Sequence, residues 1–233
     1  MNRAWRKSLL PVVLWGVLCA LPADSAAQSG RVPVRPADVD RVETELNALA
    51  ADPAHPDDRF IVACIREAIA ATREGSGGIG ACLVREETGE IVERGHNRQY
   101  TPHFRSDLHA EMDLLNRFED RIRILKPTDG KTGSPRLMYE GLALYSSYEP
   151  CPMCMTRILN TRIKRVLYAA PDPEGGMTSQ IALLPPFWRE LAAGTAFAQA
   201  RCSVRLTEMS RILFGSYAKR DLNAGPPATS GGK

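Results

Sequence analysis

The spacing of apolar residues along the chain predicts six helices. The clearest one runs from Asp57 to about Glu74, where apolar residues recur three and four positions apart until the glycine-rich stretch "GSGGIG" ends the pattern. Asp57 or Asp58 is expected to cap its N-terminus. The same spacing predicts further helices at 38–50, 108–118, 151–160, 188–193 and 207–222.

Short apolar runs bounded by turn residues predict strands between these helices. Residues 81–97 are predicted to form two strands joined by a turn at Thr88–Gly89. Further strands are expected at 142–147, 165–170 and 198–204. Because helices and strands alternate, we expect an α/β fold with a mixed central sheet between two layers of helices, a three-layer α/β/α domain.

Composition indicates where this domain begins and ends. We expect a linker and a short helix at 28–56, the α/β domain at 57–222, and a disordered tail at 223–233, which is rich in glycine and proline. A long loop is predicted at 119–141, because it contains the stretch "KPTDGKTGSPR".

The first 27 residues resemble a secretory signal peptide. A basic start precedes the apolar run "LLPVVLWGVLCAL", and the small residues Ser25 and Ala27 mark a cleavage site. The run is short for a bilayer span, and a retained anchor is the alternative. We therefore expect an exported protein, periplasmic or secreted, with no stable membrane span. Its folding and metal loading would then take place outside the cytoplasm.

The charge balance gives no sign of a strong polyanion binder. The net charge is +3 at pH 7, and residues 1–27 contain three basic residues and one acidic residue, so little charge remains on the rest of the chain. Basic residues around the long loop are expected to form a solvated face, because no aromatic residues interleave with them to stack nucleobases. Nucleic-acid binding is therefore the minority interpretation.

Cleavage would leave five cysteines, and an odd number is a poor disulfide framework. Cys64 lies on the apolar face of its helix and is expected in the core. Cys82 and Cys202 fall in strand-like runs and are interpreted as buried thiols, although a Cys82–Cys202 bridge stays open.

Two short motifs contain residue types that bind metals. "SDLHAEM" places His109 and Glu111 at the start of a helix that Asp107 can cap. "PCPMC" places Cys151 and Cys154 in the first turn of another helix, where free N–H groups and the helix dipole favour thiolates. One imidazole and two thiolates suit Zn²⁺. The alternative is a Cys151–Cys154 disulfide.

With three ligands already supplied by His109, Cys151 and Cys154, Glu111 need not bind the metal and can take part in proton transfer. Three protein ligands leave a fourth position open, as in catalytic zinc sites, and the sequence offers no second Cys-x-x-Cys motif to close it. Glu111 can then act on a zinc-bound water. The other histidines, His55, His96 and His103, have no partner pattern and are expected at the surface or in loops.

The combination of "HAE" and "PCPMC" resembles the zinc-dependent cytidine and deoxycytidylate deaminase superfamily, whose pattern is H-x-E followed by P-C-x-x-C. The likeness extends from about Asp57 to Ala170. "EPCPMC", together with Asn97 in "GHN", is most similar to the branch that holds guanine deaminases and bacterial tRNA adenosine deaminases. The resemblance implies a cytidine-deaminase-like version of the fold and a homodimer.

The resemblance also assigns roles to individual residues of this sequence. They are the zinc ligands His109, Cys151 and Cys154, the proton shuttle Glu111, and the substrate-binding Asn97 and Ala110, the latter through its backbone N–H. It implies that hydroxide on Zn²⁺ attacks a ring carbon that bears an amine, while Glu111 carries a proton to the ring nitrogen and then to departing ammonia.

The sequence therefore predicts a zinc-dependent hydrolytic deaminase of a nucleobase or small nucleoside-like substrate, with a guanine-type purine preferred. Export argues against a tRNA substrate. The alternatives are an adenosine deaminase acting on tRNA or another polynucleotide, a non-catalytic zinc-binding effector module of the same fold, and a thiol–disulfide protein.

Overall fold

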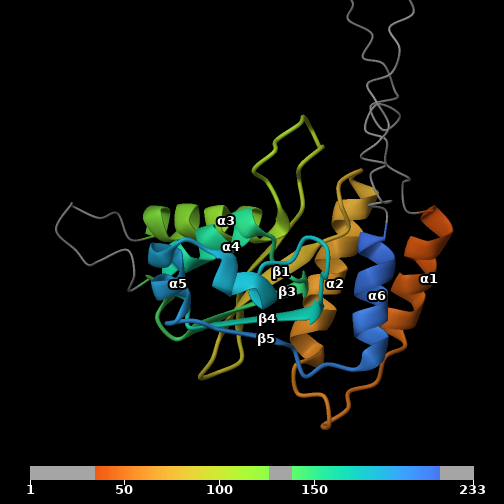
Figure 1. Ribbon diagram of the computed structural model, residues 1–233. Helices are drawn as coiled ribbons and strands as arrows, with labels where there is room; N and C mark the ends of the chain where they lie inside the picture. The colour runs from red at the N-terminus through yellow and green to blue at the C-terminus, as the bar shows by residue number, and fades with distance from the viewer. Residues whose placement is uncertain (1–34, 126–137, 216–233) are drawn as a thin grey trace, which may run out of the picture.

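A five-stranded mixed sheet forms the centre of the protein (Figure 1). The computed structural model describes residues 35–125 and 138–215. Along the sheet the strand order is β2-β1-β3-β4-β5. The strands are β1 (Gly80–Arg85), β2 (Ile91–His96), β3 (Leu142–Tyr148), β4 (Arg165–Ala170) and β5 (Ala196–Gln199).

The directions of the strands decide where polar residues can gather. β1 pairs antiparallel with both β2 and β3, whereas β3, β4 and β5 pair in parallel. β2 and β3 therefore run in the same direction, and their carboxyl ends lie at the same edge of the sheet. The N-terminal end of β1 lies between them, where the N–H of Gly80 donates a hydrogen bond to Ser147 Oγ (3.1 Å).

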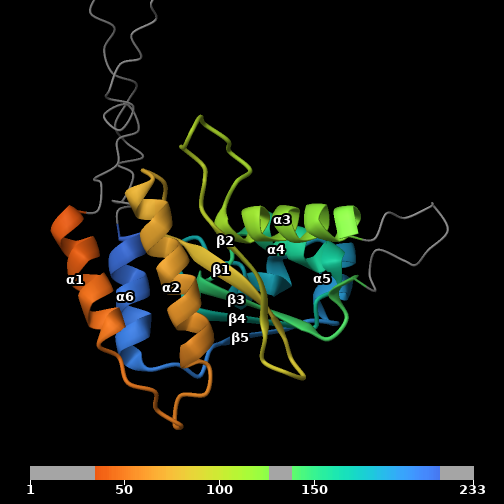
Figure 2. The same ribbon diagram turned by 180° about the vertical axis from the view of Figure 1, so that it is seen from behind.

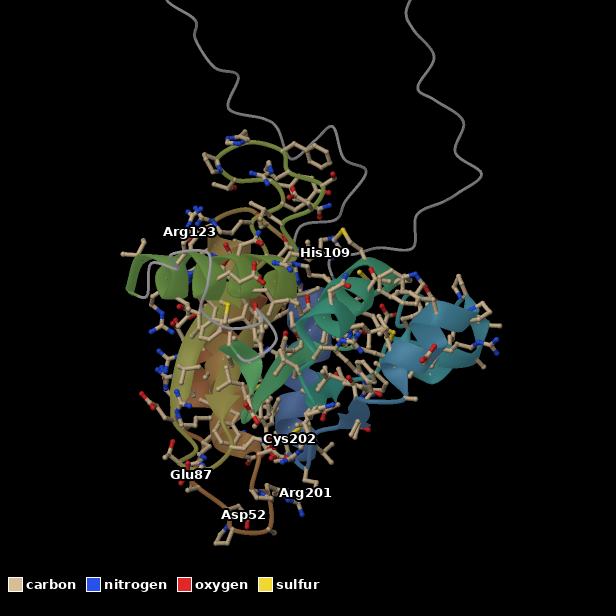
Figure 3. All side chains as sticks on the ribbon, turned by 90° about the vertical axis from the view of Figure 1, so that its left-hand side faces the viewer. Asp52, Glu87, His109, Arg123, Arg201 and Cys202 are labelled. Atoms are coloured by element: carbon tan, nitrogen blue, oxygen red, sulfur yellow. The ribbon has the colours of Figure 1, made fainter. Side chains whose placement is uncertain are left out.

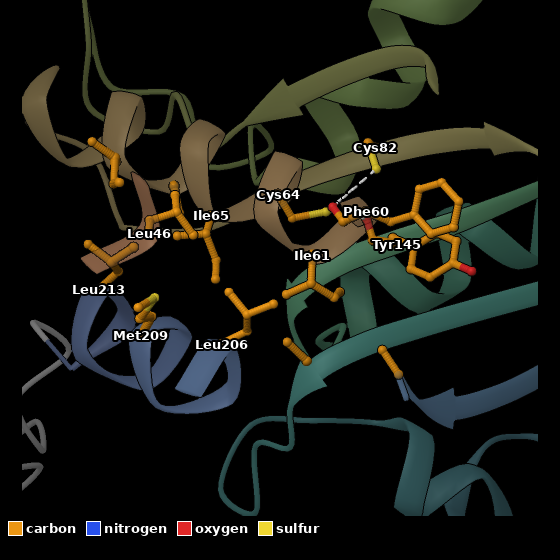
Figure 4. Packing of buried hydrophobic residues seen from close by; sticks show 14 of the residues in the cluster. Leu46, Phe60, Ile61, Cys64, Ile65, Cys82, Tyr145, Leu206, Met209 and Leu213 are labelled. Atoms are coloured by element: carbon orange, nitrogen blue, oxygen red, sulfur yellow. Dashed lines mark hydrogen bonds between the residues drawn. The ribbon is translucent and has the colours of Figure 1, made fainter. Parts of the chain in front are cut away.

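Three helices lie on one side of the sheet, two directly on it and the first packed against these two (Figure 2). They are α1 (Pro36–Asn47), α2 (Asp58–Arg73) and α6 (Val204–Phe214). Apolar side chains of α2 and α6, including Ile61, Ile65 and Leu206, pack with Cys82 and Tyr145 of the sheet in one buried cluster (Figure 4).

α1 belongs to this cluster, although its residues lie in the segment expected to be linker and short helix. Its side chains Val39, Val42 and Leu46 are at most 3% exposed. Burial of each such side chain stabilises the fold by about 1.5–3 kcal/mol. α1 therefore adds to the core that α2 and α6 form.

The opposite face of the sheet carries α3 (Ala110–Leu125) and α4 (Pro152–Thr161), and α5 (Pro186–Ala192) packs against α4. Leu114 and Leu115 of α3 and Ile158 of α4 share a buried cluster with Leu83 and Leu144 of the sheet. A short 3₁₀ helix, η3 (Thr178–Leu183), precedes α5. Two helical layers enclose a mixed sheet, so the predicted α/β/α architecture is confirmed.

Asp57 occupies the N-cap position of α2 as predicted, but the expected capping hydrogen bond from its side chain is missing. Asp57 instead accepts hydrogen bonds from the N–H of Arg201 (2.7 Å) and the hydroxyl of Tyr145 (3.1 Å). Asp58 accepts from the N–H of Ser203 (2.7 Å). Both carboxylates therefore anchor the chain that leads into α6.

Several boundaries differ from the predictions. α3 continues to Leu125, so the loop expected at 119–141 begins as helix, and residues 126–137 lie outside the described part of the chain. β5 ends at Gln199, before the predicted end at 204, and α6 begins at Val204 instead of 207. The expected signal at 1–27 and tail at 223–233 also lie outside the described residues. Within the described ranges, no helix is long and apolar enough to cross a membrane.

Cys64, Cys82 and Cys202 are free thiols. The Cys82–Cys202 disulfide that the sequence left as an alternative is therefore wrong. The sulfur of Cys82 lies 3.6 Å from the sulfur of Cys64, and both residues are fully buried (Figure 4). Cys202 follows β5 instead of lying in it, and its sulfur lies 3.7 Å from the hydroxyl of Thr207.

The close approach of α2 to β1 at Gly80 gives a test of the packing. A Cβ atom at this position would lie 2.1 Å from the carbonyl oxygen of Cys64 and 2.7 Å from the backbone nitrogen of Ala68. Because neither backbone atom can move away without shifting α2, Gly80→Ala should lower the free energy of unfolding in urea by about 1–3 kcal/mol. Gly194→Ala is the control, since its nearest neighbour, Leu191 O, lies 3.5 Å away. Equal stability of the two variants would contradict the packing described.

Candidate functional site

The predicted metal ligands meet at the edge where β2 and β3 end. His109 directly precedes α3, and Figure 3 labels it where the chain enters that helix. Cys151 is the N-cap residue of α4, and Cys154 lies in its first turn. The Nδ1 atom of His109 lies 3.6 Å from each of the two sulfurs. The structure therefore brings His109 together with two cysteines that lie 42 and 45 positions further along the sequence.

The three donors fit a zinc ion in both chemistry and spacing. In a tetrahedral site, Zn–S distances of about 2.3 Å and Zn–N distances of about 2.0–2.1 Å place nitrogen and sulfur roughly 3.6 Å apart, as observed. All three donor atoms lie within 4.8 Å of one another. Cys151 and Cys154 are free thiols, so the disulfide alternative is wrong.

The two thiols have opposite protonation tendencies. Hydrogen bonds, the larger from Cys154 and the smaller from His109, together lower the pKa of Cys151 to about 4, against the effect of burial. The hydrogen bond with Cys151 and burial raise the pKa of Cys154. These pKa shifts favour the thiolate at Cys151 and the thiol at Cys154, and binding of a cation by both sulfurs would release the proton of Cys154.

Glu111 lies beside the ligands but holds a different set of contacts. It is 3% exposed, and its Oε1 accepts a hydrogen bond from the hydroxyl of Ser146 (3.1 Å). Burial raises the pKa of Glu111, and the nearby Cys151 raises it further. A carboxyl with a raised pKa can both take and release a proton near neutral pH, as a proton shuttle must.

The start of α3 differs from the prediction. The carbonyl of His109 accepts the hydrogen bond of the Asp113 N–H (2.9 Å), so the helix begins at Ala110. The expected cap, Asp107, instead pairs its carboxylate with the guanidinium of Arg105. As the first helical residue, Ala110 has an N–H without a partner inside the helix. This N–H could donate to a ligand, and the substrate-binding role expected for it stays a prediction.

Asn97 follows β2 and is fully buried. Its Oδ1 accepts a hydrogen bond from the N–H of Gln99 (2.9 Å), which fixes the side chain. Its Nδ2 is buried and has no hydrogen-bond partner in the described part of the protein. An unpaired buried donor costs about 1–3 kcal/mol. The orphaned amide therefore supports the prediction that Asn97 binds a ligand.

Sequence reasoning missed Glu149, which anchors the loop that carries the cysteines. Its carboxylate accepts hydrogen bonds from the N–H groups of Asp172 and Thr178 (2.9 Å each) and of Ser179 (3.3 Å). The hydroxyl of Thr178 also donates to it. Glu149 is 6% exposed. Its place directly before the proline of "PCPMC" is the local signal that could have indicated this role.

His96 was expected at the surface or in a loop, and this is wrong. It ends β2, and its side chain is held between the carboxylate of Glu67 in α2 and that of Glu74, the residue that follows α2. Nδ1 lies 2.8 Å from Glu67 and Nε2 lies 3.2 Å from Glu74. The backbone N–H of His96 donates to Asp113 of α3 (3.3 Å). His96 thus fixes the strand end from which Asn97 projects.

Replacing Glu149 tests whether it supports the metal ligands. Glu149→Gln turns one acceptor oxygen into an NH₂ donor and leaves loop N–H groups unpaired. We expect the affinity for Zn²⁺ to fall by about tenfold, which is the lower end of the range for residues that orient metal ligands without binding the metal. Titration against a chromophoric zinc chelator measures this change. Glu174→Gln, an exposed neighbour in the same segment, is the control. Equal zinc affinity in both variants would remove the assigned role.

His96 predicts a pH dependence of stability. The hydrogen bond with Glu67 raises the pKa of the His96 imidazole above 6.5. Burial lowers this pKa, and the carboxylate of Glu74 raises it, so that the net shift is upward. A raised folded-state pKa means that the stabilisation is complete below pH 6.5 and is lost as the pH rises through the folded value. The free energy of unfolding of wild type minus that of His96→Asn should therefore shrink from pH 6 to pH 9. A difference that stays constant or grows would be inconsistent with an imidazolium between these carboxylates.

Comparisons with known proteins agree with this site. The model of the cytidine and deoxycytidylate deaminase zinc-binding region matches residues 54–170, half of the chain. The tRNA-specific adenosine deaminase of Bacillus subtilis (strain 168) is 36% identical over 125 residues, which cover 54% of this chain and 68% of the relative. The tRNA-specific adenosine deaminase of Aquifex aeolicus is 30% identical over 126 residues, 54% of this chain and 74% of that protein.

A solved structure of guanine deaminase from Nitrosomonas europaea is 18% identical, with a TM-score of 0.47, and the overlap covers 72% of this chain and 87% of the other. An overlap this limited does not distinguish one substrate from another. The matched family segment contains His109, Glu111 and both cysteines of the site. The chain therefore belongs to the cytidine and deoxycytidylate deaminase zinc-binding family, and it is a zinc-dependent deaminase.

Proposed function

We propose that the protein deaminates adenosine in RNA, in a tRNA or a similar stem-loop, and converts it to inosine with release of ammonia. The observation that carries this proposal is the match to two tRNA-specific adenosine deaminases over at least two thirds of their lengths. It favours the polynucleotide alternative over the free guanine-type base that the sequence patterns preferred.

The residues around the metal can hold a purine ring. Asn97 Nδ2 and the N–H of Ala110 are two hydrogen-bond donors for acceptor atoms of the base. Asn97 has its Oδ1 fixed by Gln99, so its amide is aimed before the substrate arrives. Such pre-organisation lowers the entropy lost on binding.

Zn²⁺ bound by His109, Cys151 and Cys154 would lower the pKa of a water molecule to about 7 and so supply a nucleophile at neutral pH. Glu111 would accept one proton of the attacking water and deliver it to the ring nitrogen beside the carbon under attack. It would then take the remaining proton from the hydroxyl added to that carbon and pass it to the amine, which leaves as ammonia. Ser146 keeps one oxygen of Glu111 in place through these transfers. Water and adenosine thus balance with inosine and ammonia.

Glu111→Gln tests the assigned proton transfer. An amide cannot carry the proton, so inosine formation should fall by about 10²–10⁴-fold, whereas zinc should stay near one ion per chain because the three ligands are intact. Ammonia release and metal analysis measure the two effects. Asp120→Asn, an exposed carboxylate on the same helix, is the control. Turnover retained in Glu111→Gln would overturn this role.

A substrate panel tests the proposed class. We expect inosine in an RNA stem-loop and little ammonia from free guanine or cytidine. The rate on RNA should also fall steeply with salt, because phosphate contacts release counterions. Rapid release from guanine alone would restore the free-base assignment. Absence of turnover on every substrate, with zinc bound, would favour a non-catalytic zinc module.

We also propose that the protein is exported, because residues 1–27 have the pattern of a cleaved signal. The RNA would then be met outside the cytoplasm. N-terminal sequencing of protein recovered from outside the cytoplasm should begin at Gln28. An N-terminus at Met1 or Asn2, with the protein inside the cell, would refute export.

A further inference from the structure

The chain between Asn97 and His109 forms a projecting arm, residues 98–108, that no role assigned above explains. Figures 1 and 2 show it as the loop between β2 and α3 that rises beyond the helices. Two backbone hydrogen bonds close its base, from the N–H of Arg98 to Leu108 O (2.9 Å) and from the N–H of Arg105 to Gln99 O (2.8 Å). The arm is therefore a defined hairpin-like structure.

The arm is also braced against the end of α2. The N–H of Tyr100 donates to Ser76 Oγ (3.2 Å), and the hydroxyl of Thr101 donates to the carbonyl of Glu74. These contacts hold one side of the arm against the protein and leave the other side exposed. What the arm presents is consequently fixed relative to the metal site.

An aromatic pair lies at the far end of the arm. Phe104 is 64% exposed, and its ring packs on that of Tyr100 with centroids 5.5 Å apart and planes tilted by 47°. Exposing a large aromatic ring gives no benefit to the fold itself. An exposed aromatic pair on an arm whose two ends adjoin Asn97 and His109 is, however, a surface on which unpaired bases can stack.

The base of the arm contains unpaired polar atoms. Four buried side-chain nitrogen or oxygen atoms lack a hydrogen-bond partner in the described part of the protein, and three belong to the consecutive residues Asn97, Arg98 and Gln99. They are Asn97 Nδ2, Arg98 Nε and Gln99 Oε1. Because each such atom is costly without a partner, three of them in consecutive residues support the presence of a polar ligand at the base of the arm.

We propose that the arm binds the nucleotides that flank the target adenosine in single-stranded RNA. A base next to the target stacks on Phe104 and Tyr100, while Arg98 and Gln99 bind polar atoms of its backbone or edge. This inference rests on the proposed RNA substrate. It explains why basic and aromatic residues interleave in "NRQYTPHFR", away from the solvated basic residues of the long loop.

Phe104→Ala is the direct test, with Phe104→Trp as the conservative variant. The control is Phe187→Ala on α5, which removes another exposed ring (61%) outside the site. Binding is followed by the fluorescence of 2-aminopurine placed beside the target adenosine in an RNA stem-loop, because stacking on an aromatic ring changes its emission. KM and kcat are measured on the same RNA, and thermal unfolding checks that each variant is folded.

We expect Phe104→Ala to bind the stem-loop about 5- to 150-fold more weakly, the loss of one stacked base, and to raise KM with kcat little changed. Phe104→Trp and Phe187→Ala should bind like wild type. Equal binding of wild type and Phe104→Ala, or no binding by wild type, would overturn the inference. If Phe104→Ala weakens binding but wild type forms no inosine, the arm is confirmed as an RNA site and the proposed reaction is wrong.

Discussion

The site depends on one constraint of the sheet: β2 and β3 run in the same direction and each leads towards the N-terminus of a helix on the same face. That topology places His109 and the two cysteines at adjacent helix starts. Free N–H groups and the positive end of each helix dipole then face the same point, where thiolates and a cation-bound anion are stabilised. The metal ligands are thus assembled by strand order and not by proximity in sequence.

Residues that do not bind the metal keep these strand and helix ends in place. Glu149 ties the cysteine loop to residues 172–179, and His96 ties the end of β2 to α2. Ser146 at the end of β3 holds Glu111. Each of these polar groups joins two separate elements, so a change in one is expected to shift a ligand or the proton shuttle although it does not touch the substrate. Proteins of this fold can therefore differ in the loops around the metal ligands, and so in substrate, while the ligands and the reaction stay the same.

Local patterns predicted what local interactions determine. Apolar spacing located α2 and the strands, and the two motifs located all three metal ligands and Glu111, because the residue types themselves carry the chemistry. Predictions failed where distant residues compete for a side chain. Asp57 and Asp58 were expected to cap α2 but bind N–H groups 144 and 145 positions away. His96 was expected at the surface and lies between two carboxylates. The loop contacts of Glu149 and the shape of the arm depend on distant residues, so the sequence patterns did not predict them.

The central claim is that His109, Cys151 and Cys154 hold a zinc ion in the protein as isolated. Anomalous diffraction at the zinc absorption edge, from crystals grown without added metal, tests it most directly. The account predicts a single strong peak bonded to the histidine Nδ1 and both sulfurs at about 2.0–2.3 Å. Absence of a peak, with the two sulfurs joined to each other, would contradict it.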